Sequence, residues 1–124
     1  MTDRDEIERA VLDYVEGWYA SDAARMGAAL HPSLAKRRVT PEGEVWDVTR
    51  DWMIDATGNG QGAIDDPSSG RKDVQILDMT EAMASVKLVS EQFDDYLHLA
   101  KSQGEWRIVN ALWDYRQGST EDET

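Results

Sequence analysis

The spacing of apolar residues changes from a helical to a strand-like period across one segment of this chain, GNGQGAIDDPSSG at residues 58–70. Before it, apolar residues recur mainly at three- and four-residue steps, and after it they mainly alternate with polar residues. Helical patterns followed by a run of strand patterns are typical of α+β folds, in which helices cover one face of a sheet. The order therefore predicts an α+β fold and argues against alternating βαβ units.

Three helices are predicted in the first half of the chain. Thr2 and Asp5 have the spacing of a capping-box start, and an amphipathic apolar stripe follows over residues 3–20. The other two are a short helix that follows Ser21 or Asp22 and ends at Pro32, and a third that follows Asp47 or Thr49 and ends at Gly58. These helices precede most of the strands.

Strand-like alternation appears in two places. A short pair of strands is predicted on either side of a turn at residues 41–43. Four longer strands follow the glycine-rich segment, at residues 73–79, 84–93, 95–101 and 105–115. Together these segments predict three helices packed on a curved, mainly antiparallel sheet.

The direction of the side chains on the last two strands decides which of them reach the interior. In the third long strand either Tyr96 and His98 or Leu97 and Leu99 face inward, and the larger apolar pair has the stronger claim. On the last strand Asn110 shares a face with apolar residues, namely Trp106, Ile108 and Leu112. A carboxamide in such a stripe is either a satisfied core residue or a ligand contact. We predict that the stripe points toward the helices and that Asn110 faces a cavity.

Composition predicts one soluble domain over residues 1–116 and an acidic, disordered tail at 117–124. The formal net charge of −12 argues against binding to nucleic acid or to anionic membrane surfaces. Cysteine is absent, and the N-terminus is charged where a signal peptide needs an apolar run. We therefore expect a cytoplasmic protein.

Sequence motifs indicate neither a metal nor a cofactor. The only histidines, His31 and His98, are far apart in the chain and lack the short spacing of a zinc site. The glycines at 58–62 follow a predicted helix and lack the Gly-Lys-Ser/Thr ending of a phosphate loop. They indicate a flexible loop or a cavity lid instead. Gly-x-Ser-x-Gly and HExxH motifs are also missing.

Candidate ligand-binding residues combine aromatic rings with isolated polar groups in apolar stripes. Five tryptophans in 124 residues supply enough rings for either a packed core or an aromatic-lined cavity. The candidates for ligand contact are Tyr14, Trp18, His31, Trp52, Gln92, Tyr96, His98 and Asn110. His98, His31 and Tyr14 are in addition candidates for acid–base chemistry, because an imidazole or a phenol can transfer a proton.

Four segments resemble the putative lumazine-binding family of the nuclear transport factor 2-like superfamily. They are YVEGWY from Tyr14, LHPSLAKR from Leu30, DYLHL from Asp95 and GEWRIVN from Gly104. The resemblance covers roughly residues 5–115. It implies a cone-shaped α+β fold in which a bent sheet wraps a long helix and encloses a pocket, often in a homodimer packed through the sheets.

Three functional hypotheses follow. The first is a domain that binds an unidentified small apolar or aromatic molecule in an aromatic-lined cavity. The second is an isomerase, dehydratase or cyclase that uses a pocket histidine or tyrosine as general acid or base. The third is a structural dimerisation module with a filled interior. A homodimer is expected because both faces of the last strands carry apolar residues, and one layer of helices covers only one face.

Overall fold

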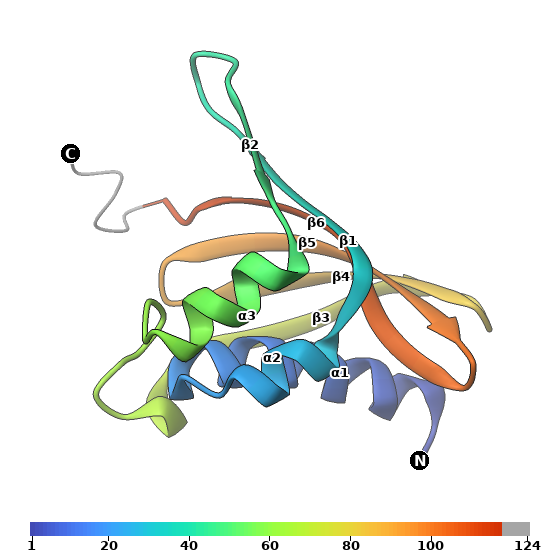
Figure 1. Ribbon diagram of the computed structural model, residues 1–124. Helices are drawn as coiled ribbons and strands as arrows, with labels where there is room; N and C mark the ends of the chain where they lie inside the picture. The colour runs from blue at the N-terminus through green and yellow to red at the C-terminus, as the bar shows by residue number, and fades with distance from the viewer. Residues whose placement is uncertain (118–124) are drawn as a thin grey trace.

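Three α-helices lie on one side of a curved six-stranded sheet in the computed structural model, which describes residues 1–117 (Figure 1). The elements are α1 (Asp3–Ala20), α2 (Ala23–Ala29), β1 (Leu30–Val39), β2 (Val45–Val48), α3 (Arg50–Gly58), the short 3₁₀ helix η1 (Pro67–Ser69), β3 (Lys72–Met79), β4 (Met83–Ser90), β5 (Phe93–Ser102) and β6 (Glu105–Tyr115). The α+β prediction is confirmed. Residues 118–124 of the predicted tail lie outside the described residues, and the domain boundary at residue 116 stays a prediction.

Helix α1 begins at the predicted capping box. The Asp5 N–H donates to the Thr2 hydroxyl at 3.1 Å, and the Thr2 N–H donates to the Asp5 carboxylate at 3.3 Å. Its apolar stripe is buried against the sheet, and the helix ends at Ser21 in the left-handed conformation, with φ 57°. The amphipathic pattern therefore sets which side of α1 faces inward, and the sheet wraps around that side.

The strand order of the sheet is β2-β1-β6-β5-β4-β3. Neighbouring strands are antiparallel except for β1 and β6, which run parallel with a register shift between Leu30 and Ala35. Pro32 lies within this irregular stretch, where its missing N–H removes no regular ladder bond. The last strand thus lies in the middle of the sheet, between β1 and β5.

A β-bulge in β6 reverses which side chains face inward. His98 pairs with Asn110 but Leu99 pairs with Ile108, so Val109 has no partner across the β5–β6 ladder. Ile108 is buried before the bulge and Ala111 is buried after it. The predicted stripe from Trp106 to Leu112 is therefore wrong beyond Ile108.

The glycine-rich segment is anchored to the body of the protein. Ile64 packs against the core, and its N–H donates to the Tyr19 carbonyl at 3.4 Å. A Cβ on Gly62 would lie 2.2 Å from the Trp18 ring, so only glycine permits this approach. The segment also contains η1, although the sequence predicted no regular element there.

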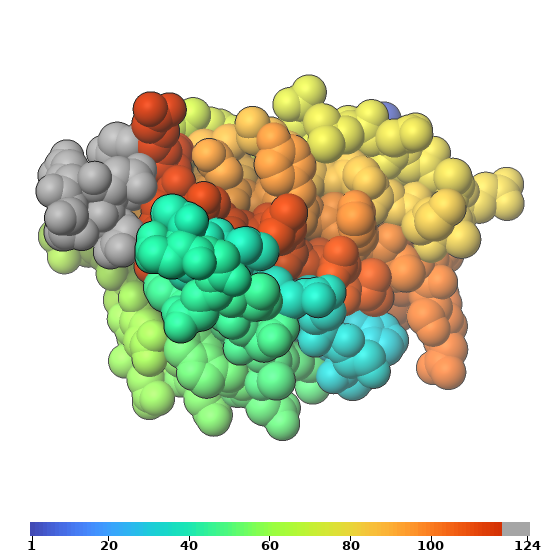
Figure 2. All heavy atoms as spheres, turned by 90° about the horizontal axis from the view of Figure 1, so that it is seen from above, coloured from blue at the N-terminus to red at the C-terminus, as the bar shows by residue number. Residues whose placement is uncertain are grey.

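The face of the sheet opposite the helices is uncovered in the described chain. Figure 2 looks onto this face, and α1 is almost entirely hidden behind it. Large exposed apolar side chains on it include Leu112 and Tyr96, which are register partners on β6 and β5. Among residues 1–117 no helix is long and apolar enough to cross a membrane.

Candidate functional site

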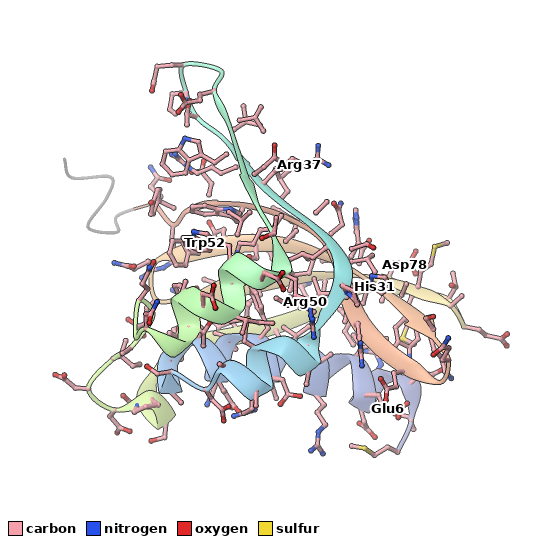
Figure 3. All side chains as sticks on the ribbon, viewed as in Figure 1. Glu6, His31, Arg37, Arg50, Trp52 and Asp78 are labelled. Carbon is pink, nitrogen blue, oxygen red and sulfur yellow. The ribbon has the colours of Figure 1, made fainter. Side chains whose placement is uncertain are left out.

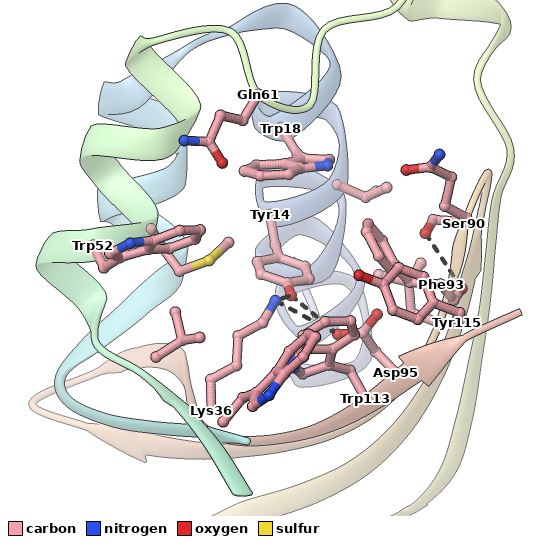
Figure 4. A pocket seen from close by; sticks show the side chains of 16 residues that line it. Tyr14, Trp18, Lys36, Trp52, Gln61, Ser90, Phe93, Asp95, Trp113 and Tyr115 are labelled. Atoms are coloured by element: carbon pink, nitrogen blue, oxygen red, sulfur yellow. Dashed lines mark hydrogen bonds and ion pairs between the residues drawn. The ribbon is translucent and has the colours of Figure 1, made fainter. Parts of the chain in front are cut away.

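A cavity of about 370 Å³ lies between the concave face of the sheet and helices α1 and α3 (Figure 4). Seven of its sixteen lining side chains are aromatic: Tyr14, Trp18, Trp46, Trp52, Phe93, Trp113 and Tyr115. Five are polar or charged: Lys36, Gln61, Ser90, Gln92 and Asp95. Many rings with a few polar groups are typical of small-molecule sites, and the volume lies at the lower end of their usual range.

The rings come from both layers of the fold. Trp18 and Trp52 belong to α1 and α3, whereas Phe93, Trp113 and Tyr115 belong to the sheet, where Trp113 lies edge-on to Phe93 with ring centroids 5.2 Å apart. Trp52 is 49% exposed, so it marks the mouth. These positions give the cavity flat walls on opposite sides (Figure 4).

The floor of the cavity holds a buried network of three polar side chains, Tyr14, Lys36 and Asp95 (Figure 4). The Tyr14 hydroxyl donates to Asp95 Oδ2 at 3.0 Å and accepts a hydrogen bond from Lys36 Nζ. Lys36 Nζ lies 4.0 Å from Asp95 Oδ2, and their side chains are only 11% and 3% exposed. We call these residues the floor triad. It joins α1, β1 and β5 at one point.

Burial opposes both charges of the floor triad. It raises the pKa of Asp95, although Lys36 and the Tyr14 hydroxyl partly oppose the rise. It also lowers the pKa of Lys36, which Asp95 opposes. Burial and the neighbouring carboxylate together raise the pKa of Tyr14 well above its ordinary value. The triad is therefore kept at an energetic cost that a purely structural apolar cluster would avoid.

Strand alternation accounts for the inward direction of Lys36 and Asp95. Asp95 shares the buried face of β5 with Leu97 and Leu99, while Tyr96 and His98 point the other way. Lys36 alternates in the same manner on β1, two residues after the buried Leu34. Lys36 also lies within 5.6 Å of the centroid of the Trp113 ring, which contributes to keeping the ammonium group in an apolar surrounding.

A second cation supports the aromatic wall beside the mouth. Arg38 Nε donates to Asp114 Oδ1 at 2.8 Å, and its guanidinium lies 4.8 Å from the ring centroids of both Trp46 and Tyr115. Its side chain is 10% exposed. Stacking of this kind holds rings in place, because a planar guanidinium packs face-on against aromatic groups. Arg38 thus fixes the strand side of the cavity.

Four of the eight predicted ligand-contact residues line this cavity: Tyr14, Trp18, Trp52 and Gln92. Gln92 lies in the turn between β4 and β5 and not in a strand, because β4 ends at Ser90. The carboxamides of Gln92 and Gln61 form no hydrogen bond within the part of the chain that the structure describes.

Three predicted residues lie on the opposite face of the sheet. Tyr96 and His98 are exposed on β5, as the favoured inward placement of Leu97 and Leu99 implied. The prediction that Asn110 faces the cavity is wrong, because the bulge at Val109 turns it outward. Its amide nitrogen lies 3.1 Å from His98 Nδ1, so these two side chains pair on the outer surface.

His31 is also remote from the cavity (Figure 3). The sequence predicts a ligand contact for His31, just before a helix end at Pro32, but α2 already ends at Ala29 and His31 is the second residue of β1. Pro32 disfavours a helical conformation in the residue before it, and the chain enters the sheet at Leu30. His31 Nδ1 accepts a hydrogen bond from the Ser33 N–H at 3.0 Å.

Sequence reasoning missed Lys36 and Asp95, because lysine and aspartate side chains usually lie in solvent. One signal existed: if Leu97 and Leu99 face inward, so does Asp95, which is two positions before Leu97. Within residues 1–117 no group of three or more histidine, cysteine, aspartate or glutamate side chains is placed to hold a metal ion.

Comparison with known proteins agrees with this architecture. A family model described as "Putative lumazine-binding" matches residues 2–114. The search of curated proteins found no match. An NTF2-like protein of unknown function from Silicibacter pomeroyi DSS-3 superposes with a TM-score of 0.76 at 20% identity, covering 94% of this chain and all (100%) of that one.

Two further solved structures show the same fold. An NTF2-like protein of unknown function from Shewanella baltica OS155 has a TM-score of 0.72 at 17% identity, covering 95% of this chain and 99% of that one. A protein of unknown function with a cystatin-like fold from Nostoc punctiforme PCC 73102 has a TM-score of 0.69 at 10% identity, covering 96% and 95%. At such identities the likeness shows the fold alone.

Proposed function

The chain belongs to the putative lumazine-binding family, and we propose that it is a small-molecule-binding domain whose cavity takes a flat, largely apolar ligand. The observation that carries the proposal is the aromatic-lined cavity of about 370 Å³, which is open at Trp52 and lined mainly by aromatic and aliphatic side chains. Ring faces on two sides favour a planar molecule, because stacked or edge-on aromatic contacts add to the free energy of burying its surface. An open cavity also favours ligand binding over a purely structural role.

A binding screen with variants tests this proposal. Lumazine, 2-quinolone and 2-naphthol are titrated separately, and binding is followed by quenching of tryptophan fluorescence and by the unfolding midpoint. Val48→Trp, at the cavity wall, fills the space, whereas Leu77→Trp makes a similar change on the exposed face of β3. We expect at least one compound to bind the parent and Leu77→Trp equally and to bind Val48→Trp at least about tenfold more weakly. Equal binding to all three proteins, or to none, contradicts a ligand cavity.

The floor triad supports a second candidate function, acid–base catalysis in the same cavity. Asp95 is a buried carboxylate with a raised pKa at the base of an apolar site, which is a common setting for a general base. In this candidate function Asp95, hydrogen-bonded to Tyr14, would transfer the proton, because the two histidines lie outside the cavity.

Proton exchange on a flat ketone tests the catalytic candidate. 2-Tetralone in deuterated water exchanges the C–H protons beside its carbonyl, and NMR measures the rate. We expect the protein to accelerate the exchange and Asp95→Asn to abolish the acceleration, with Asp94→Asn as the matched control on the other face of β5. A rate equal to that of buffer alone rules out this candidate and leaves the binding proposal intact.

A homodimer through the uncovered face of the sheet is part of the proposal. Leu112 and Tyr96 are 53% and 48% exposed at the centre of that face, and large exposed apolar groups favour association. Sedimentation should give about twice the chain mass of 14.0 kDa, and Leu112→Asp should give the single-chain mass. A single-chain mass for the parent at micromolar concentration contradicts the dimer.

A further inference from the structure

We infer that the floor triad recognises an uncharged donor–acceptor edge on the ligand, such as the adjacent C=O and N–H of a lactam in a flat heterocycle. This inference rests on the proposed binding function and specifies the chemical class of the ligand. It follows from three properties of the triad: its spare hydrogen-bonding capacity, its charge balance and its position between aromatic walls.

Lys36 has a donor to spare. An ammonium group carries three N–H bonds, and in the described chain Lys36 Nζ makes one hydrogen bond, to the Tyr14 hydroxyl. Asp95 Oδ2 at 4.0 Å is too far away for a second one. Lys36 lines the cavity, so a remaining N–H is available to a ligand oxygen.

Asp95 likewise has an acceptor to spare. A carboxylate has two oxygens that accept hydrogen bonds. Oδ2 accepts from Tyr14, and no donor within residues 1–117 reaches the other oxygen. Asp95 lines the cavity, so this acceptor is available to a ligand N–H. Tyr14 is already engaged on both sides, which makes it a positioning residue that holds Lys36 and Asp95 in place.

The charge balance of the floor selects a neutral ligand. With Lys36 protonated and Asp95 ionised, the opposite charges offset one another. An anionic ligand would bring a second negative charge next to the buried Asp95, and a cationic ligand would bring a second positive charge next to Lys36. A neutral edge that both accepts and donates a hydrogen bond satisfies both residues and adds no charge.

The aromatic walls of the cavity favour a flat molecule as the carrier of this donor–acceptor edge. Trp18 and Trp52 from the helices and Trp113 from the sheet lie around the floor triad, so a ligand that reaches Lys36 and Asp95 passes between rings (Figure 4). A bicyclic lactam presents a planar apolar body to these rings and its polar edge to the floor.

Three compounds of similar size separate the possible recognition modes. 2-Quinolone has the complete edge, 1-methyl-2-quinolone lacks the N–H, and 2-naphthoate is an anion at pH 7. Affinities are measured by isothermal titration calorimetry. We expect 2-quinolone to bind at least about tenfold more tightly than the methylated compound, since one hydrogen bond to a charged acceptor is lost. The anion should bind more weakly than 2-quinolone.

Substitution of Asp95 gives an independent test. Asp95→Asn keeps the shape but removes the negative charge, so the preference for 2-quinolone over 2-naphthoate should fall at least about tenfold. Asp94→Asn, the adjacent carboxylate on the opposite face of β5, should leave the preference unchanged. Unfolding midpoints establish that both variants are folded. If Asp95→Asn does not fold, the affinities of the parent protein for the two quinolones decide whether the edge is recognised.

Each contrary outcome has a distinct meaning. Equal affinity for the two quinolones overturns edge recognition but leaves the binding function in place. Tighter binding of 2-naphthoate than of 2-quinolone to the parent shows an anion site and also overturns the inference. If none of the three compounds binds, the inference fails, and the fluorescence screen with the cavity-filling variant decides separately whether the cavity binds ligands.

Discussion

Helix α1 separates two charged clusters that differ in their exposure to solvent. On its outer side Arg25 bridges Asp13 and Glu16 at 2.9 and 2.7 Å, and Lys72 reaches Glu16 at 2.9 Å. On its inner side lies the floor triad. The four outer side chains are 22–37% exposed, whereas those of Lys36 and Asp95 are 11% and 3% exposed. Glu16 and Tyr14 are only two positions apart, so one turn of helix serves both clusters.

The pKa directions show what solvent does to each cluster. Hydrogen bonds from Lys72 and Arg25 lower the pKa of Glu16, whereas burial raises that of Asp95 despite its partners. In the outer cluster the ion pairs outweigh desolvation, and in the floor triad desolvation outweighs the pair. The outer cluster therefore adds modestly to stability, whereas the floor triad carries a desolvation cost, which agrees with our proposal that it recognises a ligand.

Removal of Asp95 should produce the largest effect. Asp95→Ala leaves Lys36 buried without its counter-ion, and we expect a loss of about 3–5 kcal/mol in the free energy of unfolding, measured by urea denaturation. Asp94→Ala, on the exposed side of the same strand, should cost less than about 1 kcal/mol. Similar losses for both variants would show that Asp95 contributes no more to stability than a carboxylate on the surface.

The pH dependence of stability should carry the signature of Lys36. Its pKa in the folded protein is lowered from 10.5 by burial, so the unfolded chain holds more protons on this group just below that pH. Folding stability should accordingly rise, relative to Lys36→Met, as the pH increases from about 8 toward 10. Urea midpoints of both proteins across this range measure the effect. A constant or falling difference would mean that Lys36 is not desolvated.

Breaking the outer cluster should have a smaller effect. Lys72→Met removes a partly exposed ion pair with Glu16, and we expect a loss of about 0.2–1 kcal/mol that shrinks at high salt. Lys87→Met is the control, because Lys87 pairs with no carboxylate in residues 1–117. A salt-independent loss above about 2 kcal/mol would mean that the ion pairs of the outer cluster are as strongly shielded from solvent as the floor triad.

The smallest effect is expected at Asn110. Its side chain pairs with His98 on the uncovered face, so Asn110→Ala should change the free energy of unfolding by no more than about 0.5 kcal/mol. Ligand affinity in the fluorescence screen should be unchanged as well. Weaker binding by this variant would mean that the outer face, and not the cavity, holds the ligand.

Local patterns predicted the elements of the fold well. The helical spacing of apolar residues and the capping box located α1. The alternation of apolar and polar residues, together with turn residues, located the strands of the meander. Both signals come from residues that are close in the sequence. The bulge at Val109 could not be predicted in this way. It depends on the register between β5 and β6, and a shift of one residue reverses every side chain after it. Asn110 was misplaced for that reason.

The candidate site was only partly predictable. Tyr14 and Trp18 follow from the inward stripe of α1, which the sequence shows directly. Lys36 and Asp95 come together from strands on either side of β6, so no spacing within one element links them. Charge alone suggests that such residues are solvated, and only the apolar neighbours Leu97 and Leu99 indicate that Asp95 is buried.

One comparison tests most directly that the floor triad is kept for ligand recognition and not for stability. The variant Tyr14→Phe/Lys36→Met/Asp95→Leu replaces the triad with apolar side chains. Its unfolding free energy and its affinity for 2-quinolone are measured together. We predict a stability equal to or above that of the parent, because replacing a buried ion pair with apolar groups is often neutral or stabilising, together with at least about a tenfold loss of affinity. Unchanged affinity, or a loss of stability as large as that of Asp95→Ala, would contradict this account.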